Sequence, residues 1–321
     1  IIFYAALSSW TILMGVLSLP FLCLQSKSIA LPAKIWIKGI FICLKYICGV
    51  THEMRGLANL SDEPVIIVSK HQSAFETFAL YYYLKKSFFI HKKQLFYIPI
   101  FGQYLMKHNM VSIDRAGHAS TMRKMITDVK KKLDSGSTII IFPEGSHNKK
   151  RTVRLLSKGF TRIVSGALEK HPELEIQVVP VGIIYQHASS FPSKVVVRYG
   201  HPIATRTIFE ANAPAKAINI LKAAVTTQLK ELSVHIPDDE NYDAVLQQLN
   251  DAQVDFTQVD QVNKMIESGI FPKPKKGKKN FLKPLLYLIQ LNSILPFLIW
   301  KTVLKKIDEI EFVDTFRFSL N

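Results

Sequence analysis

The sequence predicts an α/β fold in which helices flank a mixed β-sheet, with membrane-associated segments at both ends of the chain. Two observations support this prediction. Apolar or β-branched runs recur through the middle of the 321-residue chain, and helical patterns fill several of the gaps between them. Long apolar stretches lie near both ends. The runs that we expect to form strands cover residues 65–69, 87–90, 110–113, 137–142, 176–184 and 194–199.

The first segment, residues 1–24, contains no charged residue. A helix of that length would reach roughly 36 Å, enough to cross a bilayer core. A secretory signal is the alternative, but no small-residue cleavage pattern follows. Lysines at 27, 34 and 38 come next, so the positive-inside rule predicts that the rest of the chain lies on the cytoplasmic side.

The second segment, residues 33–50, is apolar but carries Lys34, Lys38 and Lys45. At helical spacing these lysines fall within about 40° of one another, on one narrow face. We expect a helix in the membrane interface, with its lysines towards lipid headgroups. A core helix with a solvated lysine edge is the alternative. Together, residues 1–50 are predicted to form an N-terminal membrane anchor.

Composition narrows the classes of partner. Lysine and arginine number 41 against 25 acidic residues, a net charge of +16. Basic residues border the apolar stretches and no nucleic-acid motif is present, so an anionic membrane is favoured over nucleic acid. The three cysteines all lie in the apolar N-terminal part without metal-ligand spacing, which argues against a disulfide framework and against a zinc site.

His71 and Glu76 form the first candidate site, at the end of the apolar run V-I-I-V. Their five-residue offset lets the side chains meet only if a turn separates them, as between a strand and a new helix. A neutral imidazole can take a proton from an alcohol, and a carboxylate on its other nitrogen orients it. Since no protein serine completes a triad, the substrate would supply the nucleophilic hydroxyl. Two unrelated surface residues are the alternative.

Three further features follow downstream. Phe142-Pro143-Glu144-Gly145 leaves a strand and is followed by the basic residues 149–151, a pattern that suits an anion cradle, although a solvated basic loop has the same composition. Basic residues also lie near two other strand-like runs, at Lys93 and Arg115. Pro180 lies within a strand pattern, where we expect an edge or a strand end.

These stretches together resemble the glycerolipid acyltransferase family, particularly bacterial 1-acylglycerol-3-phosphate acyltransferases. The His-x4-acid motif (HX4D/E) is present as His71 to Glu76, and three further blocks follow in the family's order and spacing. The resemblance covers about residues 50–205. The three blocks are Lys93 to Arg115, Phe142 to Gly145, and Gln177 to Val181.

The resemblance implies acyl transfer from acyl-CoA or acyl carrier protein to the sn-2 hydroxyl of lysophosphatidic acid, giving phosphatidic acid, with no further cofactor and no metal. His71 would be the general base and Glu76 its orienter. Lys93 and Arg115 would bind the acceptor phosphate. The remaining substrate-binding positions would be Glu144, Gly145, Ser146, His147 and Pro180. Backbone amides near Gly145 and Ser146 are expected to stabilise the oxyanion.

The sequence departs from the family pattern at several positions. Glu76 replaces the commoner Asp, and Gln94 replaces Glu beside Lys93. Ser146-His147 replaces Thr-Arg, so a permanent cation becomes a titratable one. Lys149, Lys150 or Arg151 could then contact the phosphate instead, and the acceptor is less well defined.

We expect the acyltransferase domain to cover residues 51–235 and to end in a helix over 213–233. Residues 236–280 are predicted to be a linker, first polar and then lysine-rich. Residues 281–321 contain an uncharged stretch, 285–300, that is short for a spanning helix. We expect an interfacial or re-entrant membrane segment there, the alternative being a docked helix that covers the acyl-chain site.

Two other functions stay open from the sequence. One is an acyltransferase that uses glycerol-3-phosphate or another lysophospholipid as acceptor. The other, from a different class, is a non-catalytic module that binds anionic lipid. A serine hydrolase is disfavoured because no Gly-x-Ser-x-Gly elbow is present. The predicted location is the membrane, with the catalytic domain on its cytoplasmic face, which is the inner membrane in a bacterium.

Overall fold

The structure is a computed structural model. It describes residues 2–23, 30–60, 64–97, 101–108, 110–113, 119–145, 150–172, 174–188, 190–275, 284, 287, 291 and 294–304.

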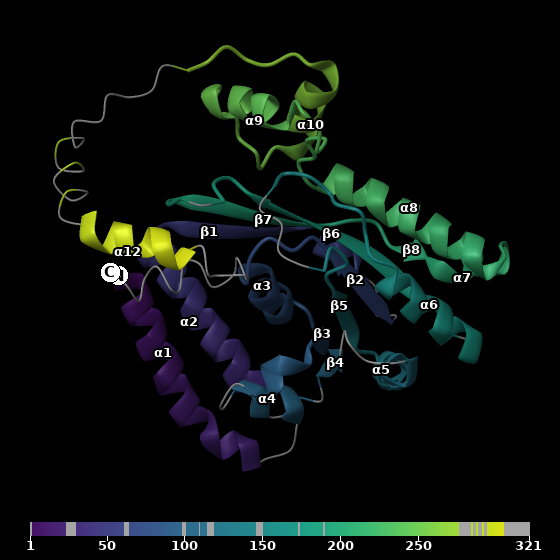
Figure 1. Cartoon of the computed structure of the whole chain (residues 1–321). Helices are drawn as coiled ribbons and strands as arrows, with labels where there is room; N and C mark the ends of the chain where they lie inside the picture. The colour runs from purple at the N-terminus through teal and green to yellow at the C-terminus, as the bar shows by residue number, and fades with distance from the viewer. Residues whose placement is uncertain are drawn as a thin grey trace.

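The N-terminal part is a pair of helices that contact each other along their length (Figure 1). They are α1 (Ile2–Ser18), continued by the 3-10 turn η1 (Leu19–Cys23), and α2 (Ala30–Cys48). The indole of Trp10 donates a hydrogen bond of 2.9 Å to the carbonyl of Trp36, which ties the pair together. Within the described residues, only the stretch Ile2–Cys23 is long and apolar enough to cross a bilayer, and 11% of its most apolar window is buried. The helices are confirmed, and their place in a membrane stays a prediction.

The predicted mixed sheet is confirmed. Its strand order is β1-β7-β6-β2-β5-β3-β4, with β8 paired to β6. All pairs are parallel except β6 with β7 and β6 with β8. The strands are β1 (Val50–Arg55), β2 (Val65–Ser69), β3 (Ser87–Lys92), β4 (Val111–Ile113), β5 (Thr138–Ile141), β6 (Gln177–Tyr185), β7 (Ser193–Tyr199) and β8 (Ile203–Ala204).

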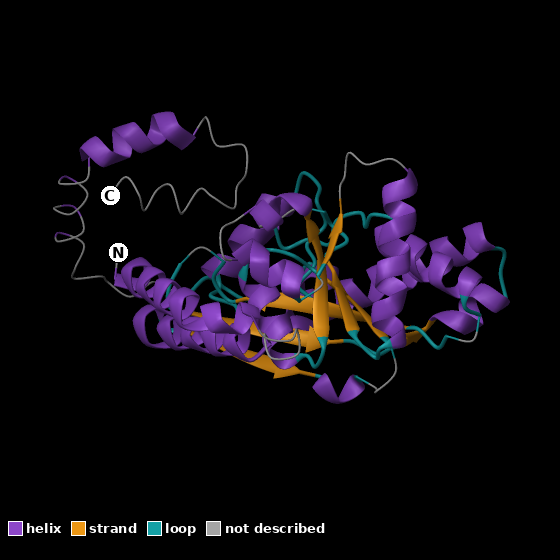
Figure 2. Cartoon of the chain, turned by 90° about the horizontal axis from the view of Figure 1, so that it is seen from below, coloured by secondary structure: helices purple, strands orange, loops and turns teal. Residues whose placement is uncertain are grey.

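Helices cover both faces of this sheet (Figures 1 and 2). One face carries α3 (Phe75–Tyr83) and α4 (Phe101–Lys107) together with the N-terminal pair. The other carries α5 (Ala119–Asp134), α6 (Gly159–Lys170) and α8 (Pro214–Leu232), with the short α7 (Thr205–Glu210) beside them. Two 3-10 turns, η3 (Leu57–Asn59) and η4 (Lys93–Tyr97), follow β1 and β3.

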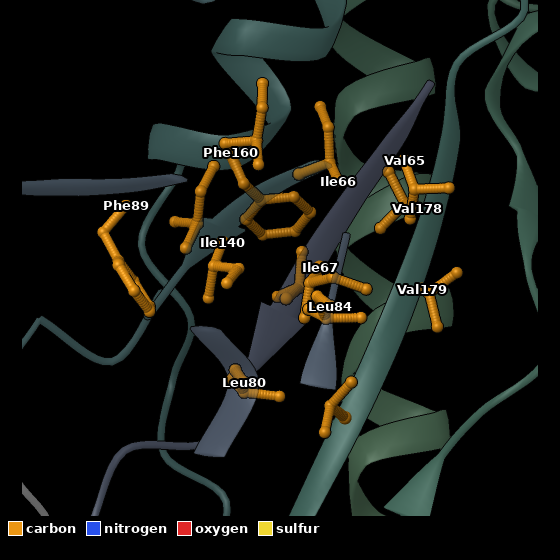
Figure 3. Close-up of a cluster of buried hydrophobic side chains, with 14 of the residues drawn as sticks. Val65, Ile66, Ile67, Leu80, Leu84, Phe89, Ile140, Phe160, Val178 and Val179 are labelled. Carbon is orange, nitrogen blue, oxygen red and sulfur yellow. The ribbon is translucent and has the colours of Figure 1, made fainter. Parts of the chain in front are cut away.

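The core is centred on β2, whose five residues are all buried (Figure 3). A parallel strand covered on both faces needs a continuous apolar run, which the sequence V-I-I-V supplies. Ile66 faces Phe160 of α6, whereas Ile67 faces α3, and both are fully buried. Each such side chain contributes roughly 1.5–3 kcal/mol to folding.

The expectation that Pro180 lies at an edge or at a strand end is wrong. Pro180 lies inside β6, which is an interior strand of the sheet. On one side β6 pairs with β8 only as far as Val178 and with β7 only from Val181. Pro180 therefore lies at the joint between two partner strands, where its missing N–H breaks no ladder. Its carbonyl accepts a hydrogen bond of 2.9 Å from the amide of Gly200.

The prediction of a linker over residues 236–280 is wrong for the first part of this range. That part contains α9 (Tyr242–Asp251) and α10 (Val259–Ser268). We call residues 234–275 the two-helix unit. Its apolar side chains pack with Ile184 and Val196 on the sheet face that also carries α8. Polar residues dominate the composition, but the apolar ones recur at helical spacing and form one buried stripe. Further along, α12 (Ile294–Leu304) lies in the predicted C-terminal segment, whose membrane contact stays a prediction.

Candidate active site

The candidate site lies at the carboxyl ends of β2 and β5, which are neighbouring parallel strands. The chain leaves β2 into α3 on one face of the sheet, and it leaves β5 towards α6 on the other. The two departing segments diverge here, which makes this edge a topological switch point, where α/β sheets commonly place ligands.

His71 and Glu76 are brought together as predicted. The chain turns after β2, and α3 begins at Phe75, so Glu76 is in the first turn of the helix. His71 Nδ1 lies 3.8 Å from Glu76 Oε2. This distance is longer than a hydrogen bond, but such catalytic contacts commonly tighten only when substrate is bound. Since Nδ1 faces the acid, Nε2 is the nitrogen that would act on a substrate.

Glu76 is held rigidly although it is fully buried. Its carboxylate accepts hydrogen bonds from the backbone amides of Gln72, at 3.0 Å, and Ser73, at 2.9 Å. The hydroxyl of Tyr185, in β6, donates a third bond of 3.0 Å to Oε1. The positive end of the α3 dipole also favours a carboxylate at this point. These donors offset the cost of burying the charge and fix its direction.

The imidazole of His71 stacks on the ring of Phe142, with 4.0 Å between the centroids and 15° between the planes. Phe142 in turn stacks on Phe89 of β3, at 6.0 Å. The side chain of His71 remains 18% exposed. The first residue of the F-P-E-G motif thus orients the candidate base, a role that the sequence analysis did not assign to it.

The rest of the F-P-E-G motif forms a tight turn. Gly145 has φ +77°, a conformation that favours glycine, and its amide donates a bond of 3.3 Å to the carbonyl of Phe142. That amide is therefore engaged within the turn, against our expectation that it faces an oxyanion. The side chain of Glu144 is largely buried beside this turn.

Lys70 is a residue that the sequence analysis missed. Its side chain is 2% exposed and its Nζ donates a long bond of 3.4 Å to the carbonyl of Lys150. Burial lowers the pKa of Lys70 to about 8, although the negative charge of Glu144 opposes this shift. A cation immediately before His71 places positive charge inside the site. The signal in the sequence was a lysine only two residues after the apolar run V-I-I-V.

The basic run after the motif does not provide free cations in its described part. Arg151 donates from Nη1 to the carbonyl of Tyr185, at 2.9 Å, and from Nη2 to the carbonyl of Gln186, at 3.1 Å. Its guanidinium also lies 3.6 Å from the ring centroid of Phe256. Lys150 forms a bond of 2.5 Å with Asp238. Arg151 is therefore a structural residue, and the expectation that it could contact a phosphate is wrong.

The two-helix unit holds the chain that follows the motif. The hydroxyl of Tyr242, at the start of α9, accepts a bond of 2.8 Å from the amide of Arg151. The carbonyl of Arg151 accepts one of 2.7 Å from the amide of Ile236. Two residues on, His235 Nδ1 accepts from the amide of Val153, at 3.1 Å. A path of contacts thus runs from the unit through Arg151 and Tyr185 to Glu76.

The other predicted site residues are placed as follows. Lys93 begins η4, directly after β3, and is exposed. Pro180 pairs in register with Val68 of β2, and the carbonyl of the next residue, Val181, accepts a bond of 3.2 Å from the amide of Lys70. Arg115, Ser146 and His147 lie outside the described residues.

A large apolar cavity of about 430 Å³ lies on the same face of the sheet as α3. Residues of α1, α2, α3 and α4 line it, among them Trp36, Thr77 and Phe78, together with Phe89 of β3. Thr77 directly follows Glu76, so the cavity begins beside the candidate site. Its size and lining are typical of small-molecule sites.

Comparison with known proteins finds a family model that matches the part of the chain containing this site. Residues 51–184 match the family model described as "Acyltransferase". The matched part begins in β1 and ends in β6, and it contains both His71 and Glu76.

Two curated relatives carry related names. The chain is 28% identical over 170 residues to a 1-acyl-sn-glycerol-3-phosphate acyltransferase of Pseudomonas aeruginosa, covering 52% of this chain and 66% of that protein. It is 32% identical over 108 residues to a chloroplastic protein of the same name from Arabidopsis thaliana, covering 33% and 30%. The matches thus span two thirds or less of the length of these relatives.

The fold also has a solved counterpart. The 1-acyl-sn-glycerophosphate acyltransferase from Thermotoga maritima superposes with a TM-score of 0.56 at 21% identity, covering 74% of this chain and 95% of that structure. That likeness supports the fold. The family match and the named relatives support the enzyme class that the sequence predicted, an O-acyltransferase. Residues 51–184 of this chain therefore match the acyltransferase family model, and this part of the chain is similar to proteins named 1-acyl-sn-glycerol-3-phosphate acyltransferase.

Proposed function

We propose that the protein transfers a fatty acyl group from a thioester, on CoA or acyl carrier protein, to the sn-2 hydroxyl of 1-acylglycerol-3-phosphate, giving phosphatidic acid. The observation that carries this proposal is the His71–Glu76 pair at the switch point, 3.8 Å apart. The curated relatives that bear this activity in their names add support.

The His71–Glu76 pair can accept one proton from the acceptor hydroxyl and later return it to the leaving thiolate. Nε2 of His71 takes the proton from the acceptor hydroxyl as its oxygen attacks the thioester carbonyl carbon. Glu76 stabilises the imidazolium that forms, and its own three donors keep it in place. When the tetrahedral intermediate collapses, the carbon–sulfur bond breaks and the imidazolium returns its proton to the departing thiolate. No cofactor is needed beyond the thioester.

Acceptor recognition is proposed on the family's motif positions. Lys93 and Arg115 would bind the phosphate, and Glu144, Gly145, Ser146 and His147 would contact the glycerol and phosphate parts. Pro180 would shape the site through its register with β2. Since Arg151 is engaged with backbone carbonyls and Lys150 with Asp238, the phosphate cations would come from Lys93, Arg115, His147 and Lys149.

We place the protein at a membrane, with the catalytic domain on the cytoplasmic face. The segment Ile2–Cys23 is largely exposed and apolar, and α2 exposes Leu31, Ile35 and Ile42. Acyl chains would then enter the apolar cavity directly from the lipid phase, because the same two helices form its wall. An acyl carrier protein is a possible donor partner, since the chain is strongly basic.

Two alternatives are kept. Glycerol-3-phosphate or another lysophospholipid could be the acceptor, because the family's Thr-Arg is replaced by Ser146-His147. A non-catalytic module that binds anionic lipid is the alternative from another class. It gives no reason for a buried carboxylate with three donors beside a histidine, which favours the enzyme.

The test is acyl transfer in detergent or liposomes, from acyl-CoA and acyl carrier protein donors to lysophosphatidic acid, glycerol-3-phosphate and lysophosphatidylethanolamine. Replacement of the base in His71→Ala should lower the rate roughly 10² to 10⁴-fold. His201→Ala is the matched control, because His201 is exposed and distant from the motif residues in sequence. A wild type that binds lipid but acylates none of the acceptors would refute the proposal.

A further inference from the structure

A second hollow, of about 680 Å³, lies at the opposite end of the sheet from His71. Its lining includes Ser87, at the start of β3, and Ser137, just before β5. These two strands are parallel, with Ser87 paired to Thr138, and β5 ends at the residue before Phe142. Four strand residues separate the two ends, roughly 13 Å. The hollow is therefore distinct from the candidate active site.

Three lysines from separate elements surround the hollow: Lys34 of α2, Lys86 of the turn between α3 and β3, and Lys132 of the last turn of α5. No carboxylate of the described residues lies within ion-pair distance of any of them. Three cations around one hollow repel one another, and a counter-ion would relieve this repulsion.

Two of these lysines are partly removed from water. Lys34 Nζ donates a bond of 3.5 Å to the carbonyl of Leu84, and Lys132 Nζ donates one of 3.4 Å to the carbonyl of His108. Both bonds are long and have neutral acceptors, and they leave ammonium protons for a further acceptor. Burial lowers the pKa of Lys132, and Asp128 offsets part of this shift. An anionic ligand would compensate for the lost hydration.

The neutral part of the lining suits an oxygen-rich anion. Ser87 is 9% exposed, and its buried hydroxyl has no hydrogen-bond partner among the described residues. The hydroxyl of Ser137 pairs only with that of Ser135 in this part of the chain, at 2.9 Å. Three ammonium groups together with hydroxyl donors match the several oxygens of a phosphate better than the two of a carboxylate.

The hollow adjoins the helix that we place in the membrane interface. Lys34 belongs to α2, which exposes Leu31 and Ile35 on either side of it. A headgroup at the bilayer surface would thus lie within reach of the three lysines. This step rests on the proposed membrane position and not on the proposed chemistry.

We propose that the hollow formed by Lys34, Lys86 and Lys132 binds the phosphate of an anionic phospholipid headgroup, at a site separate from the catalytic one. Free inorganic phosphate has the same chemistry, so the experiment includes it as a separate arm. The bound lipid would hold α2, the turn before β3 and α5 together and fix the enzyme on anionic bilayers.

The experiment compares two triple variants that remove the same charge. The pocket variant is K34Q/K86Q/K132Q. The control variant is K85Q/K131Q/K216Q. Each of its lysines is exposed and does not line the hollow, and Lys85 and Lys131 directly precede the pocket lysines Lys86 and Lys132 in sequence. Both are measured by co-sedimentation with phosphatidylcholine vesicles that contain phosphatidylglycerol, which is neither acceptor nor product of the proposed reaction. Thermal unfolding with and without inorganic phosphate is the second readout.

We expect the pocket variant to bind these vesicles at least tenfold more weakly than the control variant and to lose any thermal shift in phosphate. If both variants bind the vesicles equally weakly, the loss of binding comes from general surface charge, and the proposed site is wrong. Loss of the phosphate shift with vesicle binding equal to the control would overturn the lipid assignment in favour of free phosphate.

Two further variants keep the test interpretable. If the pocket variant does not fold, Lys86→Gln is compared with Lys85→Gln, because both residues are exposed in the same turn. In that case equal vesicle binding by the two single variants overturns the site. His71→Ala should bind vesicles as the wild type does, so failure of the acyl-transfer proposal leaves this test intact.

Discussion

Tyr185→Phe is the sharpest test of how Glu76 is positioned. The substitution keeps the packing of the buried ring but removes the hydroxyl. That hydroxyl donates a hydrogen bond of 3.0 Å to Glu76 Oε1 and lies 2.8 Å from Ser73 Oγ. A hydrogen bond to a charged group contributes about 1.5–3 kcal/mol. If that free energy is lost from the transition state, kcat falls roughly 10- to 150-fold.

The matched control is Tyr199→Phe, in the neighbouring strand β7. Tyr199 is 3% exposed, and its hydroxyl has no partner among the described residues, so its loss should change little. The assay is steady-state acyl transfer over a range of pH, with kcat and acceptor KM determined separately. A positioning role predicts a lower kcat with acceptor KM within about twofold of wild type. Equal kcat values for Tyr185→Phe and Tyr199→Phe would refute the reasoning.

Three other predictions concern stability. The pKa of Lys70 is about 8 in the folded protein, so the free energy of unfolding of the wild type should rise between pH 8 and 10.5, by on the order of 3 kcal/mol. In denaturant titrations, Lys70→Gln should not show this rise. Gly182→Ala should lower Tm, since a Cβ there would lie 2.3 Å from the carbonyl of Leu232, whereas Gly159→Ala meets nothing closer than 3.7 Å and should not. Burial lowers the pKa of His235 to about 4, so the Tm of the wild type should fall as the pH drops from 6.5 towards 4. The Tm of His235→Gln should fall less steeply over this range, and equal slopes for the two proteins would contradict the prediction.

The sequence predicted the apolar strands better than the polar one. The buried strands are continuous apolar runs, so β2 and β6 could be located almost to the residue. The edge strand β1 reads V-T-H-E-M-R, with polar residues on its exposed side, and no apolar run marks it. Pro180 was expected at an edge because the sequence does not disclose that β7 and β8 share one side of β6.

Within the candidate site, the sequence predicted the local contacts and missed those between residues distant in sequence. The pairing of His71 with Glu76 depends on one local turn, which the sequence encodes directly. Tyr185 reaches Glu76 only because β6 lies beside β2, and a contact between residues 109 positions apart leaves no local signature. Arg151 was misread for a related reason, since its partners in β6 and the two-helix unit are distant in sequence.

The contact between Arg151 and Tyr242 joins residues 91 positions apart, and this sets an order of events during synthesis. The apolar helices α1 and α2 precede the sheet in the chain, so they leave the ribosome before the sheet can be completed. The chain after the F-P-E-G motif gains its last backbone hydrogen bonds only when residues 234–275 emerge. With the membrane position proposed above, the nascent protein would reach the bilayer before its candidate active site is complete.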